Sequence, residues 1–246
     1  KDVELKDVTD DYCVFGVFGP KSRALMKSIS KDNFENDNFR FSTAKYITIE
    51  GIKIWTQRLS YVGELGYELY VKSENAKKIY ELLVNKGKDF NLSNCGMHAM
   101  DIMRMESGFL HWGHDISPEE NQYQAGLSFT ISSKKEDEFI GKKALEKIKK
   151  EKIKSRFAMF TLKDSKPGEP LLLHDEPIYL ENKIIGRSTS GNYSFNFKKN
   201  LTFGYINNDI SNDELHKKDL FIEVEKKKYP IEVINKPLKQ TNFKNN

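Results

Sequence analysis

Residues 61–72 of this chain are Tyr-Val-Gly-Glu-Leu-Gly-Tyr-Glu-Leu-Tyr-Val-Lys, a glycine-punctuated corner that leads into an apolar strand. A glycine stands on each side of Glu64, and glycine allows a backbone to turn sharply or to approach a ligand closely. Glu68 falls among apolar neighbours inside the strand predicted for 67–72. The stretch therefore predicts a strand that carries one carboxylate directly after a tight corner.

On both sides of this strand, apolar and polar residues alternate with the periods expected of β-hairpins and amphipathic helices. Further strands are predicted at 12–18, 45–49 and 52–58. Glu50-Gly51 is the expected turn of a hairpin between the last two. Pro20 fits the first turn of a helix, and Ser73 is expected to cap a second, amphipathic helix that ends at Gly87. The N-terminal half is thus predicted to mix helices and strands.

The second half of the chain has a different pattern. A methionine-rich helix is predicted at 96–107, a strand at 127–132 and a basic helix at 141–154. Short strands separated by Pro, Gly and Asn follow at 157–162, 178–180, 183–186, 201–206, 220–224 and 229–234. This spacing predicts a small antiparallel barrel or jelly roll. We therefore predict an α+β fold with a mixed domain at 1–140, a basic connector helix at 141–155 and a β-barrel domain at 156–246.

Composition narrows the classes of function. The chain has 246 residues, with 40 Lys+Arg against 36 Asp+Glu, and a formal net charge of +4. Nucleic-acid-binding proteins carry a larger and more clustered basic excess, so no nucleic-acid partner is expected. No apolar run approaches the roughly 20 residues that cross a bilayer, so no membrane partner is expected either. Cys13 and Cys95 form no disulfide framework, which predicts the cytoplasm or, in a eukaryote, the mitochondrial matrix.

Glu68 is the first candidate for ligand binding. A carboxylate that points inward needs paired donors, because burying an unpaired charge is costly. A flat heterocycle with an amino group beside a ring N–H would satisfy the carboxylate with two hydrogen bonds, as a guanidinium does. Alternatively, Glu68 faces solvent on an edge strand or pairs with a structural arginine. Periodicity leaves these alternatives open.

Arg104 is the second candidate, because it lies on a helix whose other side chains are mostly methionine and isoleucine. Asp101 precedes it by three residues, so the two side chains can form an ion pair along the helix. Arg104 can equally contact a ligand carbonyl or hold the Glu68 carboxylate. The sequence does not decide between these roles.

Three further motifs receive structural interpretations. The run His111-Trp-Gly-His-Asp115 lacks a cysteine partner and is more typical of a hydrogen-bonding loop than of a zinc site, so no metal is expected. Trp112 is interpreted as an aromatic wall that packs against core or ligand. Residues 186–194 are rich in Gly and hydroxyl groups, but no helix follows to bind phosphate, which predicts a loop between strands. The basic stretch at 142–156 is interpreted as a solvated connector.

Several motifs together resemble one family. Residues 61–68 resemble the Tyr-Thr-Gly-Glu-Asp-Gly-x-Glu segment of the glycine cleavage T-protein (aminomethyltransferase) family. Residues 103–108, Met-Arg-Met-Glu-Ser-Gly, look like its Leu-Arg-Leu-Glu-Ala-Gly. Two more matching segments follow in the family's order, at 139–145 and 189–194. Residues 112–115 and 229–238 are most similar to the folate-binding C-terminal region of dimethylglycine dehydrogenase and sarcosine dehydrogenase.

This resemblance implies a tetrahydrofolate-binding module that passes a one-carbon unit from a methylamine or aminomethyl donor to the folate. It implies that Tyr61 stacks on or borders the pterin and that Glu68 pairs with the amino and ring N–H groups of the pterin. Arg104 would contact the pterin as well. Glu64 would hold the turn between the glycines, and Trp112 would line the site.

The chain also departs from the family pattern. The family's catalytic aspartate lies in the N-terminal part of the folate domain and is expected to precede Lys1, so we expect a longer protein and a weak or inert fragment. FAD would belong to a flavin dehydrogenase domain still further upstream. Two alternatives remain: a stand-alone aminomethyltransferase or related folate-dependent demethylase, and a non-catalytic regulatory subunit of the same fold.

Overall fold

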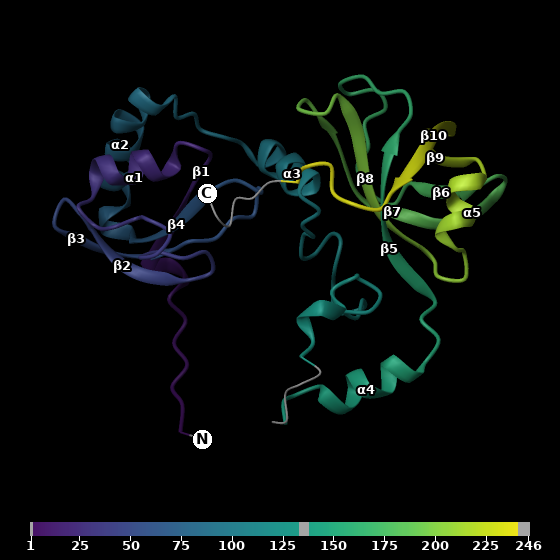
Figure 1. The fold of residues 1–246 in the computed structure, drawn as a ribbon, viewed down its shortest axis with the longest axis horizontal. Helices are drawn as coiled ribbons and strands as arrows, with labels where there is room; N and C mark the ends of the chain where they lie inside the picture. Colours follow the sequence, from purple (N-terminus) through teal and green to yellow (C-terminus); the bar gives the residue numbers. More distant parts are fainter. Residues whose placement is uncertain (1, 133–137, 241–246) are drawn as a thin grey trace. The chain divides into compact units, whose positions relative to one another are not determined.

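The computed structural model describes residues 2–132 and 138–240, which form two compact units (Figure 1). The described residues of the first unit are 2–100 and Gln240, and those of the second are 101–132 and 138–239. The chain passes between them within α3 (Met97–Glu106), because Ile102 and Met105 of this helix pack with barrel residues. The predicted domain limits at 140 and 156 follow composition instead, and they stay a prediction.

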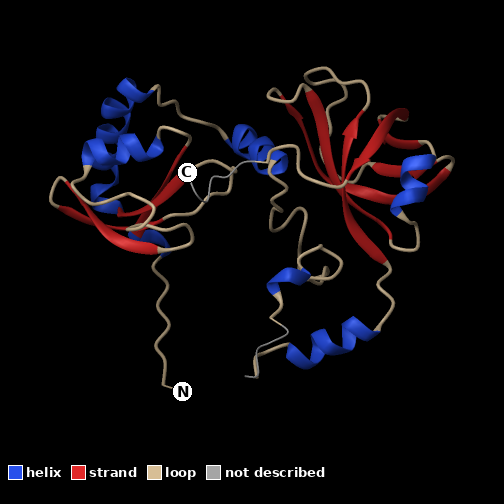
Figure 2. Ribbon diagram, viewed as in Figure 1, coloured by secondary structure: helices blue, strands red, loops and turns tan. Residues whose placement is uncertain are grey.

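The first unit is an antiparallel sheet with helices packed on one face (Figure 2). Its strands are β1 (Tyr12–Phe18), β2 (Ala44–Ile49), β3 (Ile52–Gln57) and β4 (Gly66–Lys72), in the order β1-β4-β3-β2. Its helices are α1 (Ser22–Ile29) and α2 (Ser73–Gly87), with 3-10 turns at Thr9–Asp11 and Lys88–Phe90. The predicted hairpin is confirmed: Glu50 and Gly51 have φ of 50° and 79°, as a two-residue type I′ turn requires.

Alternation along β4 decides which of its side chains enter the core. Tyr67, Leu69 and Val71 are fully buried in one cluster with side chains of α1 and α2. Successive residues of a strand point to opposite faces of the sheet. Glu68 and Tyr70, which are half-buried, therefore lie on the face opposite the helices.

Ser73 does not cap α2, contrary to the prediction. Ser73 is the first helical residue, and its hydroxyl donates a 2.9 Å hydrogen bond to the carbonyl of Asp10. The N-cap position falls on Lys72, which makes no side-chain capping bond. Because β4 stays paired with β1 as far as Lys72 opposite Tyr12, the helix begins where the strand ends.

The second unit contains a closed six-stranded antiparallel barrel, which confirms the barrel predicted from the strand spacing. Its strands are β5 (Ser155–Leu162), β6 (Pro177–Leu180), β7 (Lys183–Ser194), β8 (Lys199–Asn207), β9 (Leu220–Val224) and β10 (Lys227–Ile234). Around the barrel they follow the order β10-β5-β8-β7-β6-β9. Every one of these strands contributes apolar side chains to the interior, among them Phe160, Ile178, Ile222 and Ile231.

Two predictions about local structure in this unit are wrong. The strand predicted at 127–132 is a 3-10 turn, Ser128–Thr130, and Phe129 within it is exposed, so no core holds the segment extended. The loop predicted at 186–194 is instead the continuation of β7, paired with β8. Its glycines allow β7 and β8 to lie close together, because a Cβ on Gly186 would lie 2.0 Å from the carbonyl oxygen of Tyr205.

The helices of the second unit are short. The basic helix is confirmed as α4 (Lys142–Lys150), which buries none of its residues. α5 (Asn212–Lys217) was missed, although Ser211 before it is a capping signal: its side chain accepts a 3.1 Å bond from the N–H of Glu214. Within residues 2–132 and 138–240, no helix is long and apolar enough to cross a membrane.

Candidate functional site

The corner before β4 is built as its glycines predict. Gly63 has a φ of 66°, in the left-handed region that glycine adopts without steric cost. The N–H of Glu64 donates a 3.1 Å hydrogen bond to the hydroxyl of Ser60, which closes the corner. Gly66 makes room for a ring, because a Cβ there would lie 2.0 Å from the ring of Phe18. Tyr61 and Glu64 are half-buried in this corner.

Glu68 lies on an inner strand, so the edge-strand alternative is wrong. In the register of the sheet it stands between Gly16 of β1 and Gln57 of β3. Its carboxylate accepts a 3.2 Å hydrogen bond from the hydroxyl of Tyr70. Burial, followed by the charge of Glu68, raises the pKa of Tyr70, which keeps the phenol protonated and able to donate.

A cavity of about 800 Å³ lies on the same face of the sheet. Its lining includes Gln57 and Tyr70, the cross-strand partner and the hydrogen-bond donor of Glu68. Tyr46 and Trp55 also line it, with their ring centroids 4.9 Å apart in an edge-to-face arrangement. The cavity therefore offers flat aromatic surfaces, and two of its lining residues, Gln57 and Tyr70, are direct neighbours of the Glu68 carboxylate, which suits a planar heterocycle.

Sequence reasoning did not single out Tyr46 and Trp55. A signal for the pair was available, because the Glu50-Gly51 turn fixes the register of β2 and β3. In that register Tyr46 stands directly opposite Trp55, on the face away from the helices. Cross-strand aromatic pairs of this kind are visible in the sequence once the hairpin turn is known.

Arg104 is 1% exposed and lies within a hydrogen-bonded network of the second unit. Its Nε donates a 2.9 Å hydrogen bond to Asp101, and its Nη2 lies 2.7 Å from the same carboxylate oxygen as an ion pair. Nη2 also donates to the hydroxyl of Ser190 at 2.7 Å. Nη1 donates to the carbonyl of Phe109 at 3.1 Å and to the carboxylate of Asp115. All three nitrogens of the guanidinium therefore have protein partners, through four hydrogen bonds and the ion pair with Asp101.

Asp115 is the centre of this network, and its side chain is fully buried. Besides Arg104, it accepts hydrogen bonds from the N–H of His111 at 2.9 Å and from the hydroxyls of Thr189 and Ser190 at 2.5 and 2.8 Å. The network joins the end of α3 to the loop after it and to β7. The predicted contact between Arg104 and a pterin stays a prediction, and it would require Arg104 to exchange one of these bonds.

The motif around Trp112 forms part of the same loop. The rings of His111 and His114 lie 4.6 Å apart, and burial, with a smaller effect of His114, lowers the pKa of His111. Trp112 is 65% exposed, so the interpretation that it packs into the core is wrong. Among residues 2–132 and 138–240, no three His, Cys, Asp or Glu side chains are grouped as metal ligands.

Comparison with known proteins agrees with the motifs. The profile of the GCVT N-terminal domain matches residues 1–135, and that of the glycine cleavage T-protein C-terminal barrel domain matches residues 156–239. The chain belongs to the glycine cleavage T-protein family. The resemblance that the motifs carried is thereby confirmed, and so is the barrel as a part of this family's architecture.

Relatives of this T-protein family member include both dehydrogenases and aminomethyltransferases. Mitochondrial dimethylglycine dehydrogenase of Homo sapiens is 34% identical over 238 residues, which are 96% of this chain and 27% of that protein. The aminomethyltransferase of Halothermothrix orenii is 32% identical over 207 residues, 84% of this chain and 56% of the relative. The chain thus spans about a quarter of the length of the dehydrogenase.

The fold itself matches a solved T-protein. The crystal structure of the glycine cleavage system aminomethyltransferase T from Bartonella henselae superposes with a TM-score of 0.75. The superposition covers 89% of this chain and 57% of the other, at 22% sequence identity. At that identity the likeness establishes the shared fold.

Proposed function

We propose that this chain binds tetrahydrofolate as the one-carbon transfer module of a dimethylglycine/sarcosine dehydrogenase-like protein. In the complete protein, a methylenetetrahydrofolate would form from an N-methyl amine. Membership of the glycine cleavage T-protein family supports this class of chemistry. The observation that carries the proposal for this chain is the half-buried Glu68 beside an aromatic-lined cavity.

The chemistry of Glu68 suits the edge of a pterin. An ionised carboxylate has about four acceptor positions, and within the described part of the chain Tyr70 supplies one hydrogen bond. An amino group and a neighbouring ring N–H would fill two more, and hydrogen bonds to a charged acceptor are stronger than neutral ones. Gln57 and Tyr70 line the cavity next to Glu68, so the ring would lie against the aromatic side chains of this face.

The remaining candidate residues take different parts in this proposal. Tyr61 borders the pterin from the corner, and Glu64 holds that corner between its glycines. The contact of Arg104 with the pterin stays a prediction, and its donors hold Asp101 and the loop at Asp115. Trp112 is exposed, and its part in lining a ligand stays a prediction.

The proposed reaction draws on groups outside this chain. Tetrahydrofolate supplies the amine that takes up the one-carbon unit, and a flavin of a separate domain accepts the two electrons when the N-methyl amine is oxidised. The gain from a module of this kind is proximity, because capture within one protein replaces a bimolecular encounter in solution.

Calorimetric titration of tetrahydrofolate into the full-length protein tests this proposal. We compare the natural protein with Glu68→Gln, which keeps the shape but removes the charge, and with Glu74→Gln on the exposed side of α2 as a control. Two charge-assisted hydrogen bonds are worth about 3 kcal/mol or more, so Glu68→Gln is expected to weaken binding roughly 100-fold. Equal binding by both variants would refute the role of Glu68.

Two other functions are distinguished by this titration together with an assay of methylenetetrahydrofolate formation with and without flavin. A stand-alone aminomethyltransferase, which the 32% identity to the Halothermothrix orenii enzyme supports, would bind folate but produce methylenetetrahydrofolate without flavin. A regulatory subunit of the same fold would be well folded and bind no folate. The cytoplasmic or mitochondrial location stays a prediction.

A further inference from the structure

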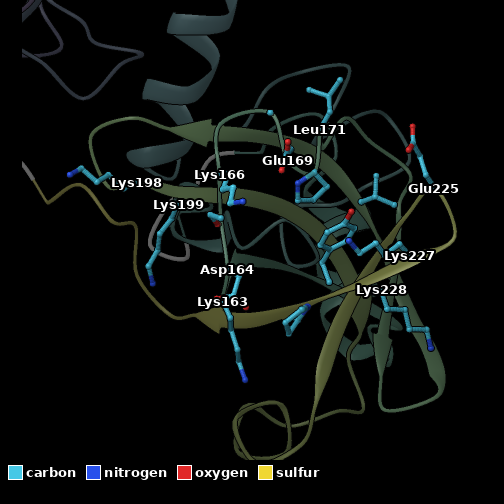
Figure 3. A pocket seen from close by; sticks show the side chains of 16 residues that line it. Lys163, Asp164, Lys166, Glu169, Leu171, Lys198, Lys199, Glu225, Lys227 and Lys228 are labelled. Carbon is cyan, nitrogen blue, oxygen red and sulfur yellow. The ribbon is translucent and has the colours of Figure 1, made fainter.

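A second cavity, of about 980 Å³, lies on the barrel and shares no residue with the aromatic cavity of the first unit. Three segments far apart in the sequence line it, at 163–171, 198–199 and 224–230 (Figure 3). Its lysines are Lys163, Lys166, Lys198, Lys199, Lys227 and Lys228. We call this set the lysine cavity.

Positive charge is concentrated at the lysine cavity. Its lining contains six lysines and three carboxylates, Asp164, Glu169 and Glu225, whereas the whole chain has a net charge of only +4. Lys199 is paired with Glu232 at 3.0 Å. Like charges gathered in a concave surface raise the local concentration of anions. The excess of lysines over carboxylates therefore favours an anionic ligand.

Three charged residues at or next to the lysine cavity have a left-handed backbone conformation, which glycine or asparagine adopts more easily. Lys198 has a φ of 53°, and Glu225 and Lys226 in the turn between β9 and β10 have φ of 51° and 64°. Glycine or asparagine adopts these left-handed angles at lower cost. The two turns therefore place charged side chains beside the cavity at positions where a smaller residue would stabilise the turn.

Aromatic rings orient two of the lysines. The Nζ of Lys228 lies 3.8 Å from the ring centroid of Tyr179, and that of Lys227 lies 5.0 Å from the ring centroid of Tyr229. Cation–π contacts of this kind restrict a side chain that is otherwise free to rotate. Tyr229 lines the cavity and Tyr179 does not, so of these two ammonium groups the one that is partly ordered within the cavity is that of Lys227.

The floor of the lysine cavity is fixed by backbone hydrogen bonds. The N–H of Lys163 donates to the carbonyl of Pro230 at 3.0 Å, which ties the first segment to β10. The N–H of Asn200 donates to the hydroxyl of Ser165 at 2.9 Å, which ties it to β8. Pro170, Tyr229 and Pro230 also line the cavity, so it offers apolar surface beside the lysines.

We propose that the lysine cavity binds a small organic anion that carries two or more phosphate or carboxylate groups. Ammonium groups act as compact point charges and accept either kind of oxyanion without a required geometry. Lysines from three segments can contact separate charged groups of one ligand, while the prolines and Tyr229 contact its apolar part. The volume lies within the range typical of small-molecule sites.

Calorimetry with two probes, inorganic tripolyphosphate and citrate, tests this site on the full chain at low ionic strength. The variant Lys166→Ala/Lys198→Ala/Lys227→Ala removes one lysine from each segment. A matched control, Lys143→Ala/Lys149→Ala/Lys150→Ala, removes the same charge from the exposed surface of α4. Each exposed charge contact contributes a few-fold to affinity, so the cavity variant is expected to bind about tenfold more weakly. The control is expected to stay within about twofold of the natural chain.

Comparing the affinities of the two probes distinguishes the two kinds of ligand: tighter binding of tripolyphosphate indicates phosphate recognition, and tighter binding of citrate indicates carboxylate recognition. The variant Lys166→Arg/Lys198→Arg/Lys227→Arg keeps the charge and is expected to retain binding. If the alanine variant is unfolded by circular dichroism, Lys166→Ala and Lys143→Ala make the same comparison singly. The proposal is overturned if neither probe binds, if both alanine variants lose equal affinity, or if orthophosphate binds as tightly as tripolyphosphate.

Discussion

Replacing Asp115 by asparagine perturbs the buried network of the second unit while keeping its shape. The Asp115 carboxylate is fully buried and accepts hydrogen bonds from Arg104, His111, Thr189 and Ser190. The new side chain would present an amide NH₂ to groups that are themselves donors, and the guanidinium of Arg104 would lose its charge partner. Removing one partner of a buried ion pair costs about 3–5 kcal/mol. We therefore expect Asp115→Asn to lower the free energy of unfolding by about that amount.

Urea denaturation followed by circular dichroism measures this loss. The control is Asp175→Asn, which removes an exposed carboxylate of the same unit that pairs with Arg187 and His174. Exposed ion pairs contribute about 0–1 kcal/mol, so the control is expected to change stability little. A loss of less than about 1 kcal/mol for Asp115→Asn, indistinguishable from the control, would refute the reasoning that Asp115 stabilises this unit through a buried ion pair with Arg104.

Two further outcomes are expected. Burial lowers the pKa of His111 below 6.5, so the unfolded chain takes up the His111 proton at a higher pH than the folded chain does. As the pH falls below about 6.5, protonation of His111 favours the unfolded chain and lowers the free energy of unfolding. His111→Gln should flatten this part of a stability–pH profile between about pH 5 and 7, and an unchanged slope would contradict it. Gly186→Ala places a Cβ 2.0 Å from the carbonyl oxygen of Tyr205 and should cost about 1–3 kcal/mol in a urea titration, whereas Gly96→Ala, with open space around it, should not.

Much of the local structure follows from the sequence alone. Glu50-Gly51 determines the hairpin turn and, through it, the register that sets Tyr46 opposite Trp55. Alternation along β4 determines that Glu68 and Tyr70 share one face. The motif at 61–68, with the motifs that follow it, was enough to predict the family. These features depend on residues close together in the chain, where the strand period of two and the demands of a tight turn act directly.

The predictions that failed or stayed open concern residues whose decisive contacts are with residues far away in the sequence. Glycines in 186–194 looked like loop residues, yet they allow β7 to approach β8 closely. Arg104 has an obvious neighbour in Asp101, but its bond to Ser190 crosses 86 positions of the chain. Local periodicity carries no information about such partners.

Only the tertiary structure decided the environment of the two cavities. Period two in β4 puts Glu68 on one face, but the packing of α1 and α2 decides which face is buried, and pairing with β1 makes the strand an inner one. The lysine cavity likewise exists because barrel closure brings three distant segments together. The physical reason is the same in both cases: burial of the apolar core selects the long-range pairings, and the polar side chains are placed by those pairings.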